Sequence, residues 1–516
     1  MIRPVRPIIV AALLCGCGDP PANTTSEATA ASTGNLADPT ATATAEPPTS
    51  GTSTAGTTGQ TTTGPTTGAT TQQPGTSTGT STTSTATTDN PGSTGTGTTQ
   101  DPDTTGSTTG APCEGLECQI DPCGGDPDKT VLRGTVVAPE GTLPLYNVTV
   151  YVPGAPLTPL AEGVQCDTCA GLDGAPIVAT LTDTSGEFVL TGVPAGAEIP
   201  LVVTVGKWRR ESVVKVTACA DNLAPAATTR LPRDKSEGHM PRIALTTGGA
   251  DPLECLLRKL GIAESEFTPP SGTGRVNLYV AEGGADRFAP NVNGGALFPK
   301  ASTLWGSLVN LMKYDMVLMA CEGGQYPEQK SQTAHENIVK YAGVGGRLFL
   351  THWHNVWIED GPLPWPLVAD FKFQADLPNP STGTIDTGFP KGLALADWMV
   401  QVGGSQVNGE VVIKEGQHTI DAIDPTRATR WIYTEAPLPA SVQHLSFNAP
   451  VDVAADQQCG RVVDSDIHVS SGDMPATPFP NGCTTKGLSP QEKVLAFMFF
   501  ELSACLLPDD QEPVPG

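Results

Sequence analysis

The sequence predicts a multidomain chain: a disordered N-terminal tether, a small antiparallel β-sandwich, and an α/β domain with a mostly parallel sheet. Thr, Gly, Ser and Pro dominate the first 112 residues, short apolar runs between turn residues follow to residue 235, and strands then alternate with amphipathic segments. The predicted parts are an N-terminal signal segment (1–16), the tether (17–112), a Cys-rich lead-in (113–130), the β-sandwich (131–235), the α/β domain (240–507) and an acidic tail (508–516).

The N-terminus has the pattern of a secretory signal peptide. Arg3 and Arg6 precede an apolar run at 8–14, which is too short to span a bilayer, and Leu14-Cys15-Gly16-Cys17 follows. This tetrapeptide resembles the lipobox of bacterial lipoproteins, which implies cleavage before Cys17 and lipidation of Cys17. The alternative is an ordinary secretory signal. We expect a lipid-anchored protein of the cell envelope, in the outer membrane or at the cell surface because Gly18 follows the cysteine.

The segment from Pro20 to Pro112 predicts disorder. It has no aromatic residue, no Lys or Arg, and Leu36 as its one bulky aliphatic side chain. Such a segment cannot bury enough apolar surface to offset its ordering entropy. It is therefore interpreted as a tether between the anchor and the folded part.

Composition excludes several classes of partner. The formal net charge is -25 and no basic block occurs, which argues against nucleic acid. Gly248-Gly249 and Gly283-Gly284 follow predicted strands but lack the spacing of a dinucleotide fingerprint. No cofactor is expected, with a divalent metal as the alternative, and the expected partners are the membrane and either a cell-surface glycan or an envelope protein.

Cysteine usage favours an oxidising compartment. Eleven of the thirteen cysteines lie between Cys113 and Cys505, which predicts disulfides with one thiol left over. The single pairing predicted is Cys459 with Cys483. Zinc is the alternative for the N-terminal group, although its spacings are irregular. That group consists of Cys113, Cys118, Cys123, Cys166 and Cys169.

The region 131–235 predicts a β-sandwich, with strands at 131–138, 146–153, 177–183, 187–190, 201–205 and 212–217. The run Thr-Asp-Thr-Ser-Gly-Glu-Phe from Thr182, followed by Val-Pro-Ala-Gly from Val193, resembles the carboxypeptidase regulatory-like domains, which are prealbumin-like sandwiches. The resemblance implies a module for presentation or adhesion.

The region 240–507 predicts strands at 242–246, 276–280, 316–320 and 347–351, and helices at 252–260, 303–313 and 329–341. Leu253, Leu256, Leu257 and Leu260 give the first helix one apolar face. Apolar strands such as 316–320 are typical of a sheet covered on both faces.

Two segments of this domain carry a further resemblance. The first is the run Gly-Gly-Arg-Leu-Phe-Leu-Thr-His from Gly345 to His352, which follows a strand from Met316. The second is Gly-Arg-Val-Val-Asp-Ser-Asp-Ile-His from Gly460. Together they resemble the ThuA-like branch of the class I glutamine-amidotransferase-like fold. That resemblance implies a flavodoxin-like α/β domain. The domain combination is similar to a group of myxobacterial lipoproteins.

Polar residues at predicted strand ends are the candidate site, because ligands of open parallel sheets bind at the carboxyl edge. His352 with His354, and Asp466 with His468, are two apart and would share a face of an extended segment. Imidazoles and a carboxylate form a plausible set of ligands for a divalent metal. The alternative is that these histidines are hydrogen-bonded parts of the structure.

Cys321 follows a strand and precedes Gly323-Gly324, which makes it a candidate nucleophile. The match to a nucleophile elbow is poor, since the first glycine of the elbow is Met319 here, and His352 stands at the elbow's own position. A catalytic cysteine needs a lowered pKa. The alternatives are a buried or a disulfide-bonded cysteine.

One loop is rich in aromatic residues and is a candidate ligand loop for sugars, since aromatic faces with adjacent carboxylates suit sugar rings. The alternative is a small satellite core. The candidate residues are Trp353, Trp357, Glu359, Asp360 and Trp365.

Two functions of different classes follow. The first is an envelope lipoprotein that displays a binding or structural α/β domain outside the cytoplasm and recognises a glycan. The second is an extracytoplasmic hydrolase or metal-dependent enzyme. The sequence favours the non-enzymatic hypothesis, and convergence of the candidate side chains in one place would favour the enzymatic one.

Overall fold

A computed structural model describes residues 113–169, 171–470 and 472–516. The predicted signal peptide, the lipidation site Cys17 and the tether lie outside the described residues. Within the described part of the chain, no helix has the length and apolar character needed to cross a bilayer.

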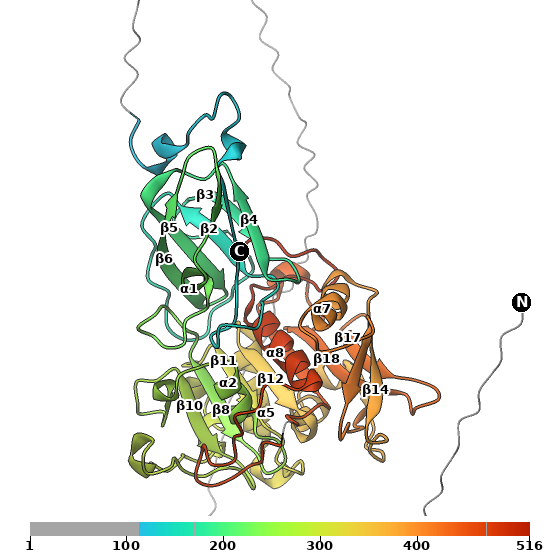
Figure 1. The fold of residues 1–516 in the computed structure, drawn as a ribbon. Helices are drawn as coiled ribbons and strands as arrows, with labels where there is room; N and C mark the ends of the chain where they lie inside the picture. Colours follow the sequence, from blue (N-terminus) through green and yellow to red (C-terminus); the bar gives the residue numbers. More distant parts are fainter. Residues whose placement is uncertain (1–112, 170, 471) are drawn as a thin grey trace, which may run out of the picture. The chain divides into compact units, whose positions relative to one another are not determined.

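The first folded region is a β-sandwich of two sheets (Figure 1). One sheet has the order β3-β2-β5-β6 and the other β4-β1-β7. Strands β5 and β6 form one long hairpin across Gly206 and Lys207, so they are longer than predicted, and β7 was not predicted. The strands are β1 (Val131–Thr135), β2 (Thr149–Pro153), β3 (Pro176–Leu181), β4 (Glu187–Thr191), β5 (Gly196–Val205), β6 (Trp208–Val216) and β7 (Asp221–Leu223), and the short helix α1 (Ala226–Thr229) follows.

The second region contains a ten-stranded sheet of order β15-β14-β17-β18-β19-β12-β11-β8-β10-β9. Two further strands, β13 (Ala369–Phe371) and β16 (Ile420–Ile423), form a separate two-stranded sheet. The strands of the large sheet are β8 (Ile243–Thr247), β9 (Phe267–Thr268), β10 (Val276–Val280), β11 (Met316–Met319), β12 (Arg347–Thr351), β14 (Ser381–Ile385), β15 (Glu410–Ile413), β17 (Thr429–Thr434), β18 (Ser441–Ala449) and β19 (Gly460–Ser465).

The large sheet is mixed: five of its strand pairings are parallel and four are antiparallel. The six strands from β9 to β19 are parallel to their neighbours, whereas β18, β17, β14 and β15 join in antiparallel pairs. These four antiparallel strands all come from the insertion between β12 and β19. Short connections within that insertion, such as residues 435–440 between β17 and β18, favour antiparallel pairing.

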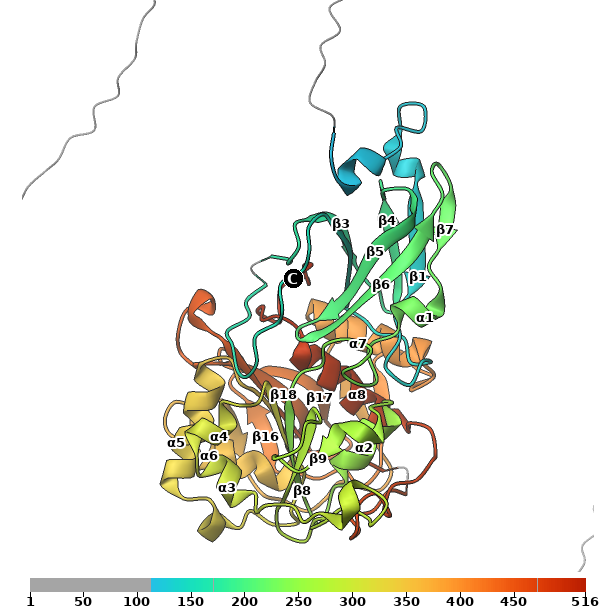
Figure 2. The ribbon, with the colours of Figure 1, turned by 90° about the vertical axis from the view of Figure 1, so that its left-hand side faces the viewer.

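Helices cover both faces of the sheet (Figure 2). Buried residues of α2, α7 and α8 belong to one core cluster, and those of α3, α4, α5 and α6 to another. Strand residues alternate between the two clusters, as Leu318 and Val317 show. The helices are α2 (Leu253–Lys259), α3 (Ser302–Trp305), α4 (Leu308–Leu311), α5 (Gln332–Gly343), α6 (Val356–Glu359), α7 (Pro390–Gln401) and α8 (Pro490–Ser503).

The helix predicted at 303–313 is two helices in the structure. Gly306 ends α3, and Ser307 has extended backbone angles and accepts a hydrogen bond on its side chain from the backbone of Asn310. Serine is a favoured N-cap residue, so this position starts a new helix instead of continuing the old one.

Five disulfides confirm the expected use of cysteine, but not the predicted pairing. Cys459 is bonded to Cys166 and Cys483 to Cys255, so the predicted Cys459–Cys483 bond is wrong. The zinc alternative for the N-terminal cysteines is also wrong, because each of them is in a disulfide. The remaining bonds are Cys113–Cys118, Cys123–Cys219 and Cys169–Cys505.

Candidate functional site

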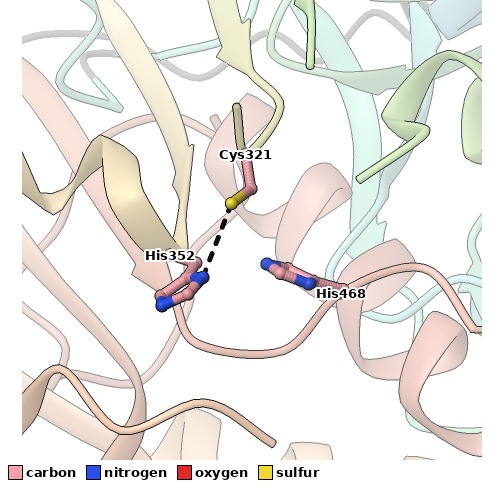
Figure 3. Close-up of side chains that lie close together, drawn as sticks. All are labelled: Cys321, His352 and His468. Carbon is pink, nitrogen blue, oxygen red and sulfur yellow. Dashed lines mark hydrogen bonds between the residues drawn. The ribbon is translucent and has the colours of Figure 1, made fainter. Parts of the chain in front are cut away.

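Three neighbouring parallel strands bring together three side chains from distant parts of the sequence. Cys321 lies just after β11, His352 directly follows β12, and His468 lies just beyond the end of β19. Because β11, β12 and β19 are adjacent and parallel, their carboxyl ends meet at one edge. Figure 3 shows the three side chains facing a common point.

The donor atoms of this cluster are close enough to share one ligand. One donor atom each from Cys321, His352 and His468 lies within 4.8 Å of the others. The sulfur of Cys321 is 3.5 Å from Nδ1 of His352, and the two imidazole rings are 5.3 Å apart between centroids. Cys321 is the one free cysteine of the described chain.

The backbone holds Cys321 and His352 in place. The amide of Cys321 donates to Oγ1 of Thr351 at 2.8 Å, and the amide of Gly323 donates to the Cys321 sulfur at 3.4 Å. His352 has a φ of 46°, a left-handed conformation that is uncommon for residues other than glycine. Such strained conformations persist where the surrounding structure enforces them, and they cluster at functional sites.

Burial keeps Cys321 and His352 electrically neutral. Cys321 is fully buried, and burial raises the pKa of its thiol to about 12, although the amides of Trp353 and Gly323 partly oppose this. Burial, with a smaller contribution from His468, lowers the pKa of His352 to about 3. At neutral pH the pair is therefore a thiol beside a neutral imidazole, and not a thiolate–imidazolium pair.

Two imidazole nitrogens of the cluster have no hydrogen-bond partner among the described residues. They are Nε2 of His352 and Nε2 of His468, and both are shielded from solvent. Buried polar atoms are nearly always paired, so unpaired ones need an explanation. In His352 the unpaired atom is Nε2, whereas the nitrogen that faces the sulfur of Cys321 is Nδ1.

Asp251 supports the cluster from the loop after β8. It is fully buried, and its Oδ1 accepts the amide proton of Val469 at 3.0 Å, next to His468. Burial raises the pKa of Asp251, and His468 opposes that rise. Asp251 was not predicted as a site residue, although a carboxylate four residues after a strand end is a usable signal.

Gly248 lets this loop approach Cys321. A Cβ at this position would lie 2.1 Å from the backbone oxygen of Cys321 and 2.3 Å from that of Ala320. The next amides continue the contact, since the amide of Ala250 donates to the oxygen of Cys321 at 2.9 Å. Gly248 was set aside in the sequence analysis as an incomplete nucleotide motif, and its role here is close packing.

His354 and Asp466, two of the predicted site residues, are engaged elsewhere. Nε2 of His354 lies 3.1 Å from the backbone oxygen of Ala320, and its Nδ1 accepts from the indole of Trp357 at 3.0 Å. Asp466 accepts from the amide and the hydroxyl of Thr419 at 2.8 and 2.7 Å. Both therefore hold the structure around the cluster.

The predicted ligand loop divides into core and surface. Trp357 and Trp365 are buried in the core under α3 to α6, as the alternative in the sequence analysis had it. Glu359 accepts from the side chain of Gln325 at 2.8 Å, and Asp360 is exposed. Trp353 alone of the three tryptophans reaches the surface, where its ring lies 4.7 Å from the ring of Phe373.

Comparisons with known proteins add little. No protein-family model and no curated protein matches the chain. A solved structure of a protein described as ThuA-like, from Bacteroides uniformis, has a TM-score of 0.28 and 11% identity over 50% of this chain and 91% of its own. Two mutant complexes of type II cohesin with X-dockerin from Acetivibrio cellulolyticus have TM-scores of 0.14 and 0.13 and identities of 17% and 16%. Each covers 28% of this chain, and 79% and 78% of its own. At these TM-scores no fold or function is transferred from them.

The fold and the candidate site can be described together. The described chain is a β-sandwich joined to an α/β region with a large mixed sheet, and a Cys-His-His cluster lies at one edge of that sheet. Five disulfides are typical of proteins that work outside the cytoplasm.

Proposed function

We propose that this is a lipid-anchored protein of the cell envelope, held through Cys17, whose α/β domain binds zinc through Cys321, His352 and His468. The observation that carries the proposal is the convergence of the three donor atoms within 4.8 Å. Of the two hypotheses drawn from the sequence, this geometry supports the metal-dependent one.

The spacing of the donors fits a tetrahedral zinc ion. Zinc–sulfur bonds of about 2.3 Å and zinc–nitrogen bonds of about 2.0 Å, at the tetrahedral angle, separate the two donors by about 3.5 Å. The sulfur of Cys321 and Nδ1 of His352 are 3.5 Å apart. Small rotations of His468 would bring its nitrogen from within 4.8 Å to the same separation.

The protonation states also favour a metal over a free nucleophile. A neutral imidazole is the form that binds metal, and the lowered pKa of His352 keeps it neutral. The raised pKa of Cys321 makes an unassisted thiolate rare near neutral pH. A zinc ion held by Cys321 would favour the thiolate that burial otherwise opposes, with release of the thiol proton to solvent.

Three protein ligands are typical of a catalytic zinc ion, whose fourth position holds water with a pKa near 7. Asp251 accepts the amide proton of Val469, the residue after His468, and interacts electrostatically with His468. We therefore propose metal-assisted hydrolysis as the chemistry of the site.

The strand order supports the flavodoxin-like, amidotransferase-like assignment, which stays a proposal. Numbered along the chain without β9, the parallel strands β10-β8-β11-β12-β19 have the order 2-1-3-4-5 of flavodoxin-like sheets. In that order the ligand crevice opens where the order reverses, between β8 and β11. Gly248, Asp251 and Cys321 come from the two loops that follow these strands.

Zinc content of the purified protein tests the proposal. After dialysis against zinc and removal of excess ion, we expect about one zinc per chain in the wild type. Cys321→Ser and His468→Asn should hold substantially less. A cobalt-loaded sample should show a thiolate-to-cobalt charge-transfer band that Cys321→Ser abolishes.

His239→Asn is the matched control. The Nδ1 of His239 lies 2.7 Å from the backbone oxygen of Lys207, between the sandwich and the α/β region, so its loss should leave zinc content unchanged. A wild-type protein that retains no zinc, or a Cys321→Ser variant that retains as much as wild type, would refute the metal centre.

Glycan recognition is a second candidate, supported by the surface pair of Trp353 and Phe373. The side chain of Phe373 is 66% exposed, and the Trp353 ring is 4.6 Å from the ring of His352, beside the cluster. We expect Trp353→Ala to weaken binding to cell-surface glycans, while Val309→Ala, which removes an exposed apolar side chain elsewhere, should not. If Trp353→Ala and Val309→Ala bind glycans equally well, the pair of Trp353 and Phe373 is not a glycan-binding surface.

A further inference from the structure

A cavity of about 840 Å³ lies where the β-sandwich meets the α/β region, and it shares no residue with the Cys321 cluster. Its walls come from the sandwich loop after β1, from the end of α2, and from the segment 484–488 before α8. Its volume is in the range of small-molecule sites, which often lie at domain interfaces.

The two regions fit tightly at one wall of this cavity. The amide of Glu140 donates to the backbone oxygen of Leu260 at 3.0 Å. A Cβ on Gly261, whose φ is +90°, would lie 2.2 Å from the nitrogen of Glu140. The indole of Trp398 also donates to the backbone oxygen of Pro144 at 2.8 Å. The cavity walls are therefore fixed by direct contacts and are not a loose gap.

The charge of the lining is opposite to that of the protein. The whole chain has 54 acidic and 29 basic residues, but five basic and two acidic residues line the cavity. Lys259 is neutralised by Asp473 and Glu492, and Arg258 is paired with Glu264. In the described chain, the other three cations have no acidic partner within salt-bridge distance. These are Arg233, Lys486 and Lys493.

Two further side chains of the lining have unused hydrogen-bonding atoms. Oε2 of Glu140 and Oγ1 of Thr484 are shielded from solvent, and neither has a partner among the described residues. The other oxygen of Glu140 is held by the amide and hydroxyl of Thr142, at 3.0 and 2.9 Å, so the carboxylate is oriented. A carboxylate accepts hydrogen bonds only, so it requires a donor such as a hydroxyl group.

A ligand that matches this lining has an anionic group for the cations and hydroxyl groups for Glu140 and Thr484. Apolar side chains of Leu143, Ile262 and Leu488 complete the lining and suit the C–H faces of a sugar ring. A phosphate or sulfate ion alone would leave most of the volume unfilled. We propose that this cavity binds an acidic oligosaccharide whose sugar units carry carboxylates.

Isothermal titration of the full chain with trigalacturonate tests the proposal, with the neutral trisaccharide maltotriose and inorganic phosphate as separate titrants. We expect trigalacturonate to bind, and both of the other titrants to bind at least tenfold more weakly. Lys486→Gln with Arg233→Gln should lower affinity for trigalacturonate about tenfold or more, because hydrogen bonds to charged groups are lost. Thr484→Val should lower it by a smaller factor.

Lys215→Gln is the matched control, since Lys215 is an exposed lysine of β6 outside the cavity. It should not change the affinity, and all variants should keep the wild-type melting temperature and zinc content. Equal binding of maltotriose would overturn the anionic preference. Phosphate binding without saccharide binding would reduce the cavity to a simple anion site, and affinity unaffected by the cavity variants would place the ligand elsewhere.

Discussion

Cys321 has two properties that act in opposite directions in the absence of a metal. It faces His352, the usual partner of a reactive cysteine, but its complete burial raises the pKa of the thiol to about 12. The lowered pKa of His352 prevents the imidazolium that would offset this effect. A zinc ion removes the conflict, because it binds a thiolate and neutral imidazoles together.

These pKa directions predict the pH dependence of zinc binding. Between pH 7 and 9 the Cys321 thiol is protonated in the metal-free protein, since its pKa is about 12, so each zinc bound must release that proton. Affinity should therefore rise about tenfold per pH unit in this range. His352 is already neutral and should contribute nothing to this slope.

Competition with a chromophoric chelator at several pH values measures this slope. The residual zinc binding of Cys321→Ser should depend far less on pH than that of the wild type. A wild-type affinity that is constant from pH 7 to 9 would mean that no thiol proton is displaced, and Cys321 would then not be a ligand.

At the scale of elements, the loop after β8 is built against the loop after β11. Gly248 provides the contact, because any side chain would overlap two backbone oxygens that cannot move independently of β11. Backbone atoms of a central strand yield less than the end of a flexible side chain. The position of Cys321 thus depends on a residue with no chemistry of its own.

Gly248→Ala should lower the free energy of unfolding by about 1–3 kcal/mol or more, the usual cost of overpacking, and should reduce zinc content at the same time. Gly343→Ala is the control, since a Cβ there meets only the Cγ of Pro450 at 3.6 Å. Urea unfolding measures the free energy of unfolding of both variants. Equal stability of Gly248→Ala and wild type would contradict the close packing.

The elements also show how far sequence patterns reach. The bounds of β10 and β12 agree with the predicted strands, because each is a short buried run between turn residues. Strands β13, β15 and β16 of the insertion could not be predicted, because they are half-exposed and β13 pairs with β16 across two intervening strands of the sequence. Non-local pairing and tertiary context decide such strands.

The candidate site was predicted in part. Cys321, His352 and His468 were each identified at strand ends. Cys321 was predicted to be a nucleophile, whereas the two histidines were predicted to be metal ligands. His354 was grouped with His352 on the assumption of extended backbone, whereas residues 352–355 form a tight 3-10 turn with a left-handed first residue. A spacing of two residues then no longer places side chains on one face.

For the molecule as a whole, the sandwich and the α/β region behave as one unit. Trp208 of β6 packs against Phe499 and Phe500 of α8, with ring centroids 6.3 and 6.1 Å apart. The bonds Cys166–Cys459 and Cys169–Cys505 join the segment between β2 and β3 to the α/β region. These contacts join the two regions whose residues line the cavity of about 840 Å³.

The joining disulfides should therefore contribute to global stability. Replacing Cys166 and Cys459 together by Ser should lower the free energy of unfolding by about 2–4 kcal/mol, since the bond closes a long loop. Replacing Cys113 and Cys118, which are five residues apart and exposed, should change it far less. Thermal unfolding compares the two pairs, and equal effects would contradict a joining role.

Cys321, His352 and His468 are proposed to hold one metal ion. X-ray absorption at the zinc edge of the loaded protein tests it most directly, because it reports the ligand atoms themselves. We expect one sulfur at about 2.3 Å and nitrogen or oxygen ligands at about 2.0 Å, with the sulfur lost in Cys321→Ser. A zinc shell of light atoms alone in the wild-type protein would contradict it.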